Sequence, residues 1–223
     1  MKAKNEITTK QARLELKNLL SFGNSKLPKT TAIFNMGPAT NCPSKKRGLC
    51  ELCNKCYALK AEKIYPQVLP YRIRQSNYWK LCTAEEFADE FTAIYDRKRI
   101  KPTLLRFNES GDFCTQECYY KANEIAKILK ERHNITSYCY THRTDLIYYN
   151  SGQSLQVLKS GHKANDYLSL KYIAVPKIDP LEIKRNNQTK NLPQDKQYIC
   201  PADCKKCNLC STLKAGTIFT KIH

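Results

Sequence analysis

The chain has 223 residues, of which 41% are hydrophobic and 26% are charged. This balance is typical of a globular protein and excludes a disordered chain. The length suits one core and is short for two, so we expect a single domain over residues 1–223. The formal net charge of +18 predicts a polyanionic partner, with nucleic acid as the first candidate, because phosphates attract Lys and Arg. Lys-rich solvated faces without a partner are the alternative.

The N-terminal residues and the hydropathy pattern bear on location. Residues 1–6 lack an apolar stretch followed by small residues, so we expect no secretory signal. No apolar run approaches the length of a membrane span, so we expect no membrane partner. Both points favour the cytoplasm, where reducing conditions disfavour disulfides among the twelve cysteines and favour metal ligation.

Three parts follow one another along the chain: a basic lead-in over residues 1–30, an α/β body over residues 31–175, and an extended connection with the last cysteines over residues 176–223. Helical spacing of apolar residues predicts helices in the first two parts, and we expect Pro66 and Pro70 to break the chain between two of them. Thr83 and Glu86 form a capping-box pattern that opens a further helix. The expected helices are Gln11–Leu20, Tyr57–Ile64, Tyr71–Leu81, Thr83–Lys98 and Thr115–Arg132.

Strand patterns alternate with these helices in the body of the chain. The expected strands are Thr31–Met36, Thr103–Phe107, Ile135–Thr141, Leu155–Leu158 and Tyr172–Val175. Strand, helix and strand in succession imply parallel strands joined by right-handed crossovers. We therefore predict an α/β fold with an open parallel sheet or partial barrel, since a complete eight-fold barrel needs more chain.

Eight of the twelve cysteines form two tight sets near opposite ends of the chain. The first cysteine set is Cys42, Cys50, Cys53 and Cys56, and the second cysteine set is Cys200, Cys204, Cys207 and Cys210. Spacings of two residues let one loop wrap three corners of an iron–sulfur cube, and each set contains a fourth thiol. The pattern predicts two cysteine-rich metal-binding loops that hold one or two 4Fe-4S clusters. With two such clusters bound, the chain would still carry about +14.

Zinc is the competing metal, because four-cysteine zinc sites usually join two Cys-x-x-Cys pairs from separate stretches. Cys53 and Cys56 with Cys207 and Cys210 would make such a site, but four thiols would then be left nearby. The other four cysteines lie in expected helices or strands, where a buried thiol that packs as a small hydrophobe is the default interpretation. They are Cys82, Cys114, Cys118 and Cys139, and the helical spacing of Cys114 and Cys118 makes that pair a further metal candidate.

Two candidate catalytic residues follow expected strands. Asp112 belongs to a tight turn after the strand that ends at Phe107, and His142 follows the strand that ends at Thr141. Ligand-binding residues of parallel α/β sheets gather at this edge. His142 titrates near neutral pH and is a candidate acid, base or phosphate contact, whereas an ordinary surface histidine is the alternative. A turn followed by a helix cap is the alternative for Asp112.

Five blocks of this sequence resemble the phage gene-product-88 family, and they occur in the family's order over roughly residues 30–212. The blocks are Asn35-Met-Gly-Pro-Ala-Thr-Asn-Cys42-Pro, Cys50 to Ala58, Arg106 to Phe113, Tyr140-Thr-His-Arg, and Cys200 to Cys210. The family is found in phages and mobile elements. The resemblance implies iron–sulfur binding and an origin in a mobile element.

A more distant likeness is to radical AdoMet enzymes, which carry three closely spaced cysteines followed by Tyr after the first strand of a partial barrel. Cys50, Cys53, Cys56 and Tyr57 match that position. The likeness implies AdoMet at an open iron and a cofactor-binding segment at Ser110-Gly111-Asp112. The first cysteine set lacks the family's three-then-two spacing, the Gly-Gly-Glu signature is missing, and Cys42 would close the open iron.

The sequence therefore supports a basic iron–sulfur protein of phage or mobile-element type that contacts nucleic acid. A radical AdoMet-like enzyme that uses the first cysteine set and a zinc protein that binds nucleic acid are the alternatives. An electron-transfer protein that passes charge between two clusters is a further interpretation. Whether Cys42 is a ligand separates the binding protein from the enzyme.

Overall fold

The computed structural model describes residues 15–148, 154–161, 170–175, 197–213 and 216–221. Its strands are β1 (Ser21–Phe22), β2 (Thr31–Phe34), β3 (Leu104–Phe107), β4 (Thr136–Thr141), β5 (Leu155–Ser160), β6 (Leu170–Val175), β7 (Gln197–Ile199) and β8 (Gly216–Lys221). Its longer helices are α3 (Tyr57–Ile64), α4 (Val68–Leu81), α5 (Ala84–Arg97) and α6 (Gln116–His133). Short helical turns are η1 (Leu16–Asn18), η2 (Ala39–Asn41), α2 (Pro43–Lys46), η3 (Cys53–Lys55) and α8 (Leu209–Thr212).

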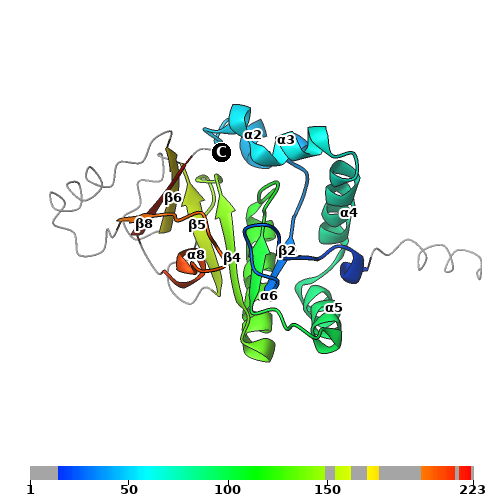
Figure 1. Cartoon of the computed structure of the whole chain (residues 1–223). Helices are drawn as coiled ribbons and strands as arrows, with labels where there is room; N and C mark the ends of the chain where they lie inside the picture. Colours follow the sequence, from blue (N-terminus) through cyan, green and yellow to red (C-terminus); the bar gives the residue numbers. More distant parts are fainter. Residues whose placement is uncertain (1–14, 149–153, 162–169, 176–196, 214–215, 222–223) are drawn as a thin grey trace, which may run out of the picture.

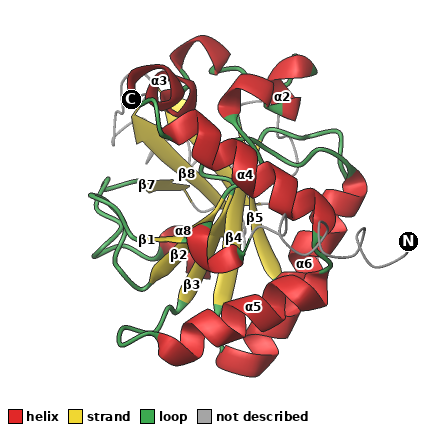
Figure 2. Ribbon diagram, turned by 90° about the vertical axis from the view of Figure 1, so that its right-hand side faces the viewer, coloured by secondary structure: helices red, strands yellow, loops and turns green. Residues whose placement is uncertain are grey.

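The described strands form one eight-stranded sheet in the order β1-β2-β3-β4-β5-β6-β8-β7. Only β1 runs antiparallel to its neighbour, and every other pair is parallel. The α/β class and the mainly parallel sheet are thus confirmed. From β2 to β6 the strands have the same order in the sheet as in the sequence. Right-handed crossovers between such parallel strands all lie on the same face of the sheet. Figure 2 shows α4, α5 and α6 in front of the strands on that face.

The main core fills the space between the sheet and these helices. Alternate strand residues point toward it, as Leu105 and Phe107 of β3 and Cys139 of β4 do, and all three are buried. Phe34 of β2 meets Phe87 of α5 edge to face, with ring centroids 5.1 Å apart. Each such aromatic pair contributes about 0.5–1.5 kcal/mol beyond area burial. The aromatic residues at the ends of β2 and β3 therefore pack the sheet against α5.

The opposite face of the sheet is covered by the C-terminal segment. Tyr138, Leu158 and Ile218 are buried there, and Cys200 and Cys210 of the second cysteine set pack against them. In Figure 1 the short helix α8 lies beside β4, on the side of the sheet away from α4 and α5. The first cysteine set lies elsewhere, beyond the carboxyl end of β2 and next to α2 and α3, at the top of Figure 1.

Three expectations needed correction. Pro70 does not break the chain but lies in the first turn of α4, where a missing N–H costs no helical hydrogen bond. Within the described residues, the expected lead-in helix is the single turn η1, and residues 11–14 lie outside the described residues. The part of the chain that carries the second cysteine set also contributes two strands that were not expected, β7 and β8. Residues 176–196 lie outside the described residues.

In the ranges that the structure describes, no helix has both the length and the apolar composition needed to cross a membrane.

Candidate metal centres

The first cysteine set is carried by the chain that leaves β2. Cys42 follows η2, Cys53 opens η3, and Cys56 precedes α3, and all four thiols are partly buried. Burial raises the pKa of Cys42 to about 11, and the Cys56 thiol adds to that rise. Burial also raises the pKa of Cys50 to about 12, helped by its hydrogen bond to Cys53. Each thiol therefore lies within electrostatic reach of another member of the set.

A buried ion pair holds the turn in front of Cys42. The Glu62 carboxylate of α3 accepts hydrogen bonds from the backbone N–H groups of Ala39 at 2.6 Å and Thr40 at 2.9 Å. Arg72 of α4 donates to the same carboxylate at 2.9 Å, and the two side chains are only 8% and 2% exposed. Burial opposes the charge on Glu62, but bonds from Thr40 and Arg72 outweigh it and lower its pKa. Helices α3 and α4 thus fix the turn that precedes Cys42.

Asp112 joins the turn after Cys42 to the ends of two strands. Its carboxylate accepts hydrogen bonds from Ser44 Oγ at 2.5 Å, from Thr141 Oγ1 at 2.6 Å, and from the backbone N–H groups of Phe113 and His142. The side chain is buried, and burial raises its pKa against the effect of these four bonds. Because every bond is internal, the carboxylate acts as a cross-link between α2, β3 and β4.

The turn before Asp112 packs backbone to backbone against the turn after β2. Gly111 has φ +72°, and a Cβ atom there would lie 2.6 Å from the carbonyl oxygen of Gly37. Asn35 Oδ1 accepts the backbone N–H of Ser110 at 2.8 Å. Ser110 is buried, like Asp112. These contacts occupy the segment that the likeness to radical AdoMet enzymes implies for cofactor binding, so its role in binding AdoMet stays a prediction.

His142 lies partly buried just beyond β4. Burial lowers its pKa, although the charge of Asp112 opposes this. Its Nδ1 atom is buried and has no hydrogen-bond partner in the described part of the chain. The loop of the first cysteine set is close by, because the charge of Glu51 in that loop also opposes the lowering of the His142 pKa. His142 is therefore a neighbour of that set, and its catalytic role stays a prediction.

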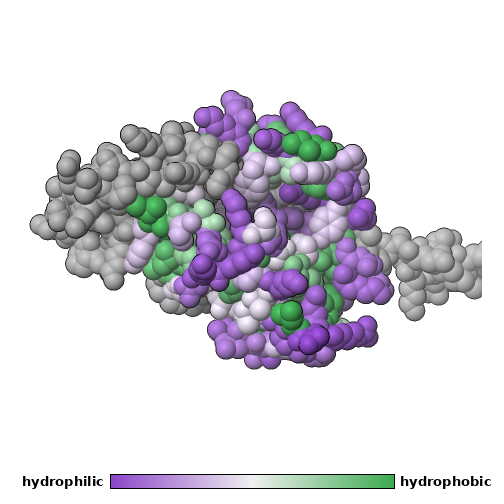
Figure 3. All heavy atoms as spheres, viewed as in Figure 1, coloured by the Kyte–Doolittle hydropathy of each residue, from purple (hydrophilic) through white to green (hydrophobic). Residues whose placement is uncertain are grey.

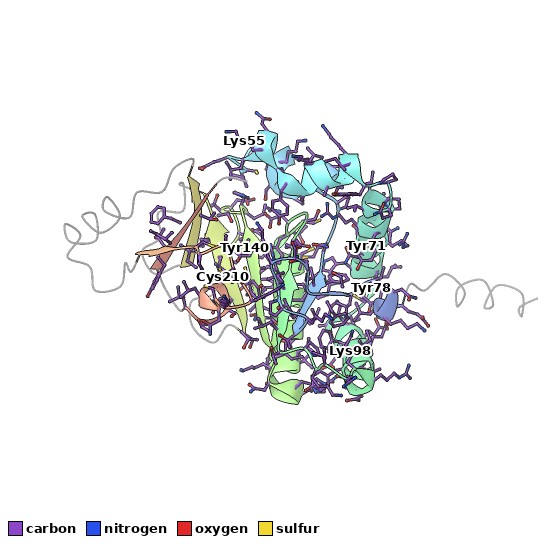
Figure 4. All side chains as sticks on the ribbon, in the orientation of Figure 1. Lys55, Tyr71, Tyr78, Lys98, Tyr140 and Cys210 are labelled. Carbon is purple, nitrogen blue, oxygen red and sulfur yellow. The ribbon has the colours of Figure 1, made fainter. Side chains whose placement is uncertain are left out.

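The second cysteine set begins directly after β7 and ends in α8. The backbone N–H of Cys200 donates to Phe219 of β8 at 2.7 Å, and Gln156 Nε2 of β5 donates to the carbonyl of Cys210 at 2.7 Å. Burial raises the pKa of Cys210 to about 11, and the three other thiols of the set raise it further. A hydrogen bond from Tyr140 opposes that rise, and Figure 4 shows the two residues side by side.

The chemistry of the donors fits an iron–sulfur cluster at each set, since four cysteine thiolates are its usual ligands. All twelve cysteines are free thiols. Within the described ranges, however, no three His, Cys, Asp or Glu side chains converge closely enough to hold a metal ion. The structure thus gathers the thiols of each set without closing them into a coordination sphere.

The four remaining cysteines divide into two kinds. Cys82 and Cys139 are buried in the main core, as expected for small hydrophobic residues. Cys114 is instead exposed, and it donates a hydrogen bond to Cys118 in the first turn of α6. This bond lowers the pKa of Cys118, and the amide and hydroxyl of Thr115 lower it too. Cys114 is therefore not part of the core, whereas Cys118 packs against the edge of the main core.

Sequence reasoning missed the pair of Glu62 and Arg72. They come from different helices separated by a turn with Pro66, and no spacing rule connects residues ten positions apart across such a turn. It also missed Ser44 as the partner of Asp112, because the two are 68 positions apart. Only the parallel order of β2, β3 and β4 brings these segments together.

Comparison with protein-family models gives a match to the family described as gene product 88, over residues 2–213. No curated protein and no solved structure matches the chain.

Proposed function

Since the chain belongs to the phage gene product 88 family, we propose that it is an iron–sulfur protein that contacts nucleic acid. Each cysteine set would hold one 4Fe-4S cluster, and a bound cluster would supply a one-electron redox centre and a cross-link between loops. One observation carries the proposal: in each set, neighbouring thiols of the same set help to raise the pKa of two members, Cys42 and Cys50 in the first and Cys204 and Cys210 in the second. A four-thiolate donor set of this kind is typical of iron–sulfur clusters.

Cys42 is the fourth ligand in this proposal. The turn in front of it is fixed by Glu62, and Ser44 behind it is fixed by Asp112. A thiol anchored on both sides is pre-organised for ligation, because its loop has little freedom left to lose on binding. With Cys42 bound, the first cluster has four protein ligands and no open iron, which favours a binding protein over an AdoMet-dependent enzyme.

The nucleic-acid contact rests on the surface around the first cysteine set. Hydrophilic side chains project there over α2 and α3 in Figure 3, and Lys55 is labelled in the same region in Figure 4. Glu51 is the one exposed acidic residue in residues 43–64. The exposed basic residues of this stretch are Lys45, Lys46, Arg47, Lys55, Lys60 and Lys63, and we call them the basic rim. Grouped basic residues of this kind favour binding of phosphates, because binding releases counterions.

Metal content tests the first half of the proposal. We expect protein purified without oxygen to contain iron and acid-labile sulfide. We also expect that replacing two ligands of one set, as in Cys53→Ser with Cys56→Ser or in Cys207→Ser with Cys210→Ser, removes about half of the iron. Cys114→Ser, outside both sets, is the matched control. Zinc in place of iron would contradict the proposal, and an EPR spectrum that shifts on adding AdoMet would favour the enzyme.

Salt dependence tests the second half. We expect binding to duplex or single-stranded nucleic acid to weaken as salt rises, with a slope that reflects the number of phosphate contacts. Replacing Lys45, Lys46 and Lys55 with Gln should lower that slope by about one per lost contact. A control variant makes the same charge change elsewhere and should leave the slope nearly unchanged. It replaces three exposed residues with Gln: Arg97 at the end of α5, Arg99 just after α5, and Lys127 on α6. Equal effects of the two triple variants would rule out the basic rim as the binding surface.

A further inference from the structure

Arg106 lies between the two cysteine sets. It belongs to β3 and points away from the main core, because its neighbours Leu105 and Phe107 point into that core. Its side chain is only 15% exposed. The residue paired with it in β4 is Tyr138, which packs with the second cysteine set. A permanent positive charge is therefore held on the sheet face that this set covers.

One side of the guanidinium group faces the first cysteine set. Arg106 Nη2 is 3.4 Å from the hydroxyl of Tyr57, the residue directly after Cys56. The Tyr57 hydroxyl also donates to the carbonyl of Glu109 at 2.7 Å. The Glu109 carboxylate pairs with Arg106 Nη1 at 3.6 Å. These contacts fix the guanidinium group close to the loop of the first set.

The other side faces the second cysteine set. The guanidinium carbon is 5.1 Å from the centre of the Tyr140 ring, within the range of a cation–π contact. Tyr140 in turn forms a side-chain hydrogen bond with Cys210. A continuous series of contacts thus runs from Cys56 through Tyr57, Arg106 and Tyr140 to Cys210.

The partners of Arg106 do not use its full hydrogen-bonding capacity. Its Nε atom is buried and has no hydrogen-bond partner among the described residues. Among the described residues, the carboxylate that pairs with it is that of Glu109, at 3.6 Å. A buried cation that is only partly compensated favours additional negative charge nearby. A 4Fe-4S cluster with four thiolates carries negative charge and gains one more unit when it is reduced.

We propose that Arg106 is a shared counter-charge for the two cysteine sets. This inference rests on the proposed function, because it requires clusters at both sets. The fixed positive charge stabilises the reduced state of each cluster, so that both are reduced more easily than they would be without it. Arg106 is a positioning residue here and not a ligand.

The test is a potentiometric titration of the full chain followed by EPR, which reads reduction potential and not activity. Arg106→Gln should lower the midpoint potential of both clusters. Arg132→Gln, which removes an arginine on α6 that pairs with Glu85 and Asp89, should change neither. Tyr140→Phe removes the hydroxyl beside Cys210 and should change the midpoint potential of the second cluster alone.

Glu109→Gln gives a second test with the opposite sign, in case Arg106→Gln does not retain its clusters. It removes the nearby negative charge and leaves Arg106 in place, so both potentials should rise. If Arg106→Gln keeps both clusters and their midpoint potentials are unchanged, the inference is overturned and the proposed function is not. If Arg106→Gln loses its clusters, unchanged potentials in Glu109→Gln have the same meaning. Wild-type protein without iron would overturn the proposed function and this inference with it.

Discussion

Asp112, a catalytic candidate by its position in the sequence, has a structural role in the fold. Its carboxylate receives four internal hydrogen bonds and reaches across from the turn after β3 to Ser44. Each of these donors lies at or beyond the carboxyl end of a parallel strand. The sequence thus predicted where Asp112 lies, the hydrogen-bond partners give it a structural role, and its catalytic role stays a prediction.

Asp112→Asn should destabilise the protein by about 1–3 kcal/mol, because the amide NH2 group would face hydrogen-bond donors that it cannot satisfy. Ser44 would lose its acceptor, so the iron of the first set should be lost before that of the second. Urea unfolding and iron analysis measure the two effects. Asp96→Asn, on the exposed side of α5, is the control and should change neither.

Cys118 should be the most reactive thiol outside the two sets. Its pKa is lowered by the hydrogen bond from Cys114 and by the helix start at Thr115, whereas burial raises the pKa of Cys82 to about 11. Alkylation at about pH 6, mapped by mass spectrometry, should label Cys118 and leave Cys82 unlabelled. Cys114→Ala should slow that labelling. Labelling of Cys118 no faster than of Cys82 would contradict the lowered pKa.

At the scale of elements, the sequence predicts those that local chemistry defines. Thr83 and Glu86 form the capping box of α5 as expected, and Thr115 caps α6. The last two strands were missed, because β7 has only three residues and β8 pairs with segments twenty or more positions away. Such strands are stabilised by their neighbours in the sheet and not by their own pattern. The candidate ligands were predictable from spacing, and their supporting residues were not.

The contact between α3 and α4 predicts a pH effect. The pKa of Glu62 is lower in the folded protein than in the unfolded chain, so the stability it contributes is complete above about pH 4.3, its ordinary pKa, and is lost as the pH falls through the folded value. Glu62→Gln should cost about 3–5 kcal/mol near neutral pH, because Arg72 is left buried without its partner.

Unfolding free energies measured from about pH 7 to pH 3 test this prediction. The wild-type protein should lose stability over the acid part of the range, and the Glu62→Gln variant should lose less of it. Glu131→Gln, an exposed position near the end of α6, should follow the wild-type curve. Parallel curves for wild type and Glu62→Gln would show that the ion pair is not the source of the acid sensitivity.

At the scale of the whole molecule, the sheet separates two environments. Its helical face holds a conventional aromatic core, whereas the other face packs on cysteines and tyrosines. Among the described residues, the second core has three buried hydrophobic side chains, and a cluster at the second cysteine set would add to its stability. We expect removal of iron with a chelator to lower the melting temperature, and we expect the C-terminal segment to become sensitive to protease first.

Limited proteolysis with mass spectrometry checks this order, with and without chelator. Cleavage should begin near Lys205 and Lys206, which are exposed between the cysteines of the second set. Protein that carries Cys207→Ser and Cys210→Ser should already show this cleavage without chelator. Equal protease resistance of the loaded and stripped proteins would mean that the C-terminal segment is held by the sheet alone.

The position of β8 bears on how the protein is made. This strand is near the end of the chain, yet it lies between β6 and β7 in the sheet. A growing chain can build β2 to β5 and the loop of the first cysteine set while the second is still being synthesised. The face with Tyr138 and Leu158 stays uncovered until residues 197–221 arrive. If each cysteine set holds the proposed cluster, delivery would occur in two stages, with the first site available during translation and the second only after residues 197–221 have left the ribosome.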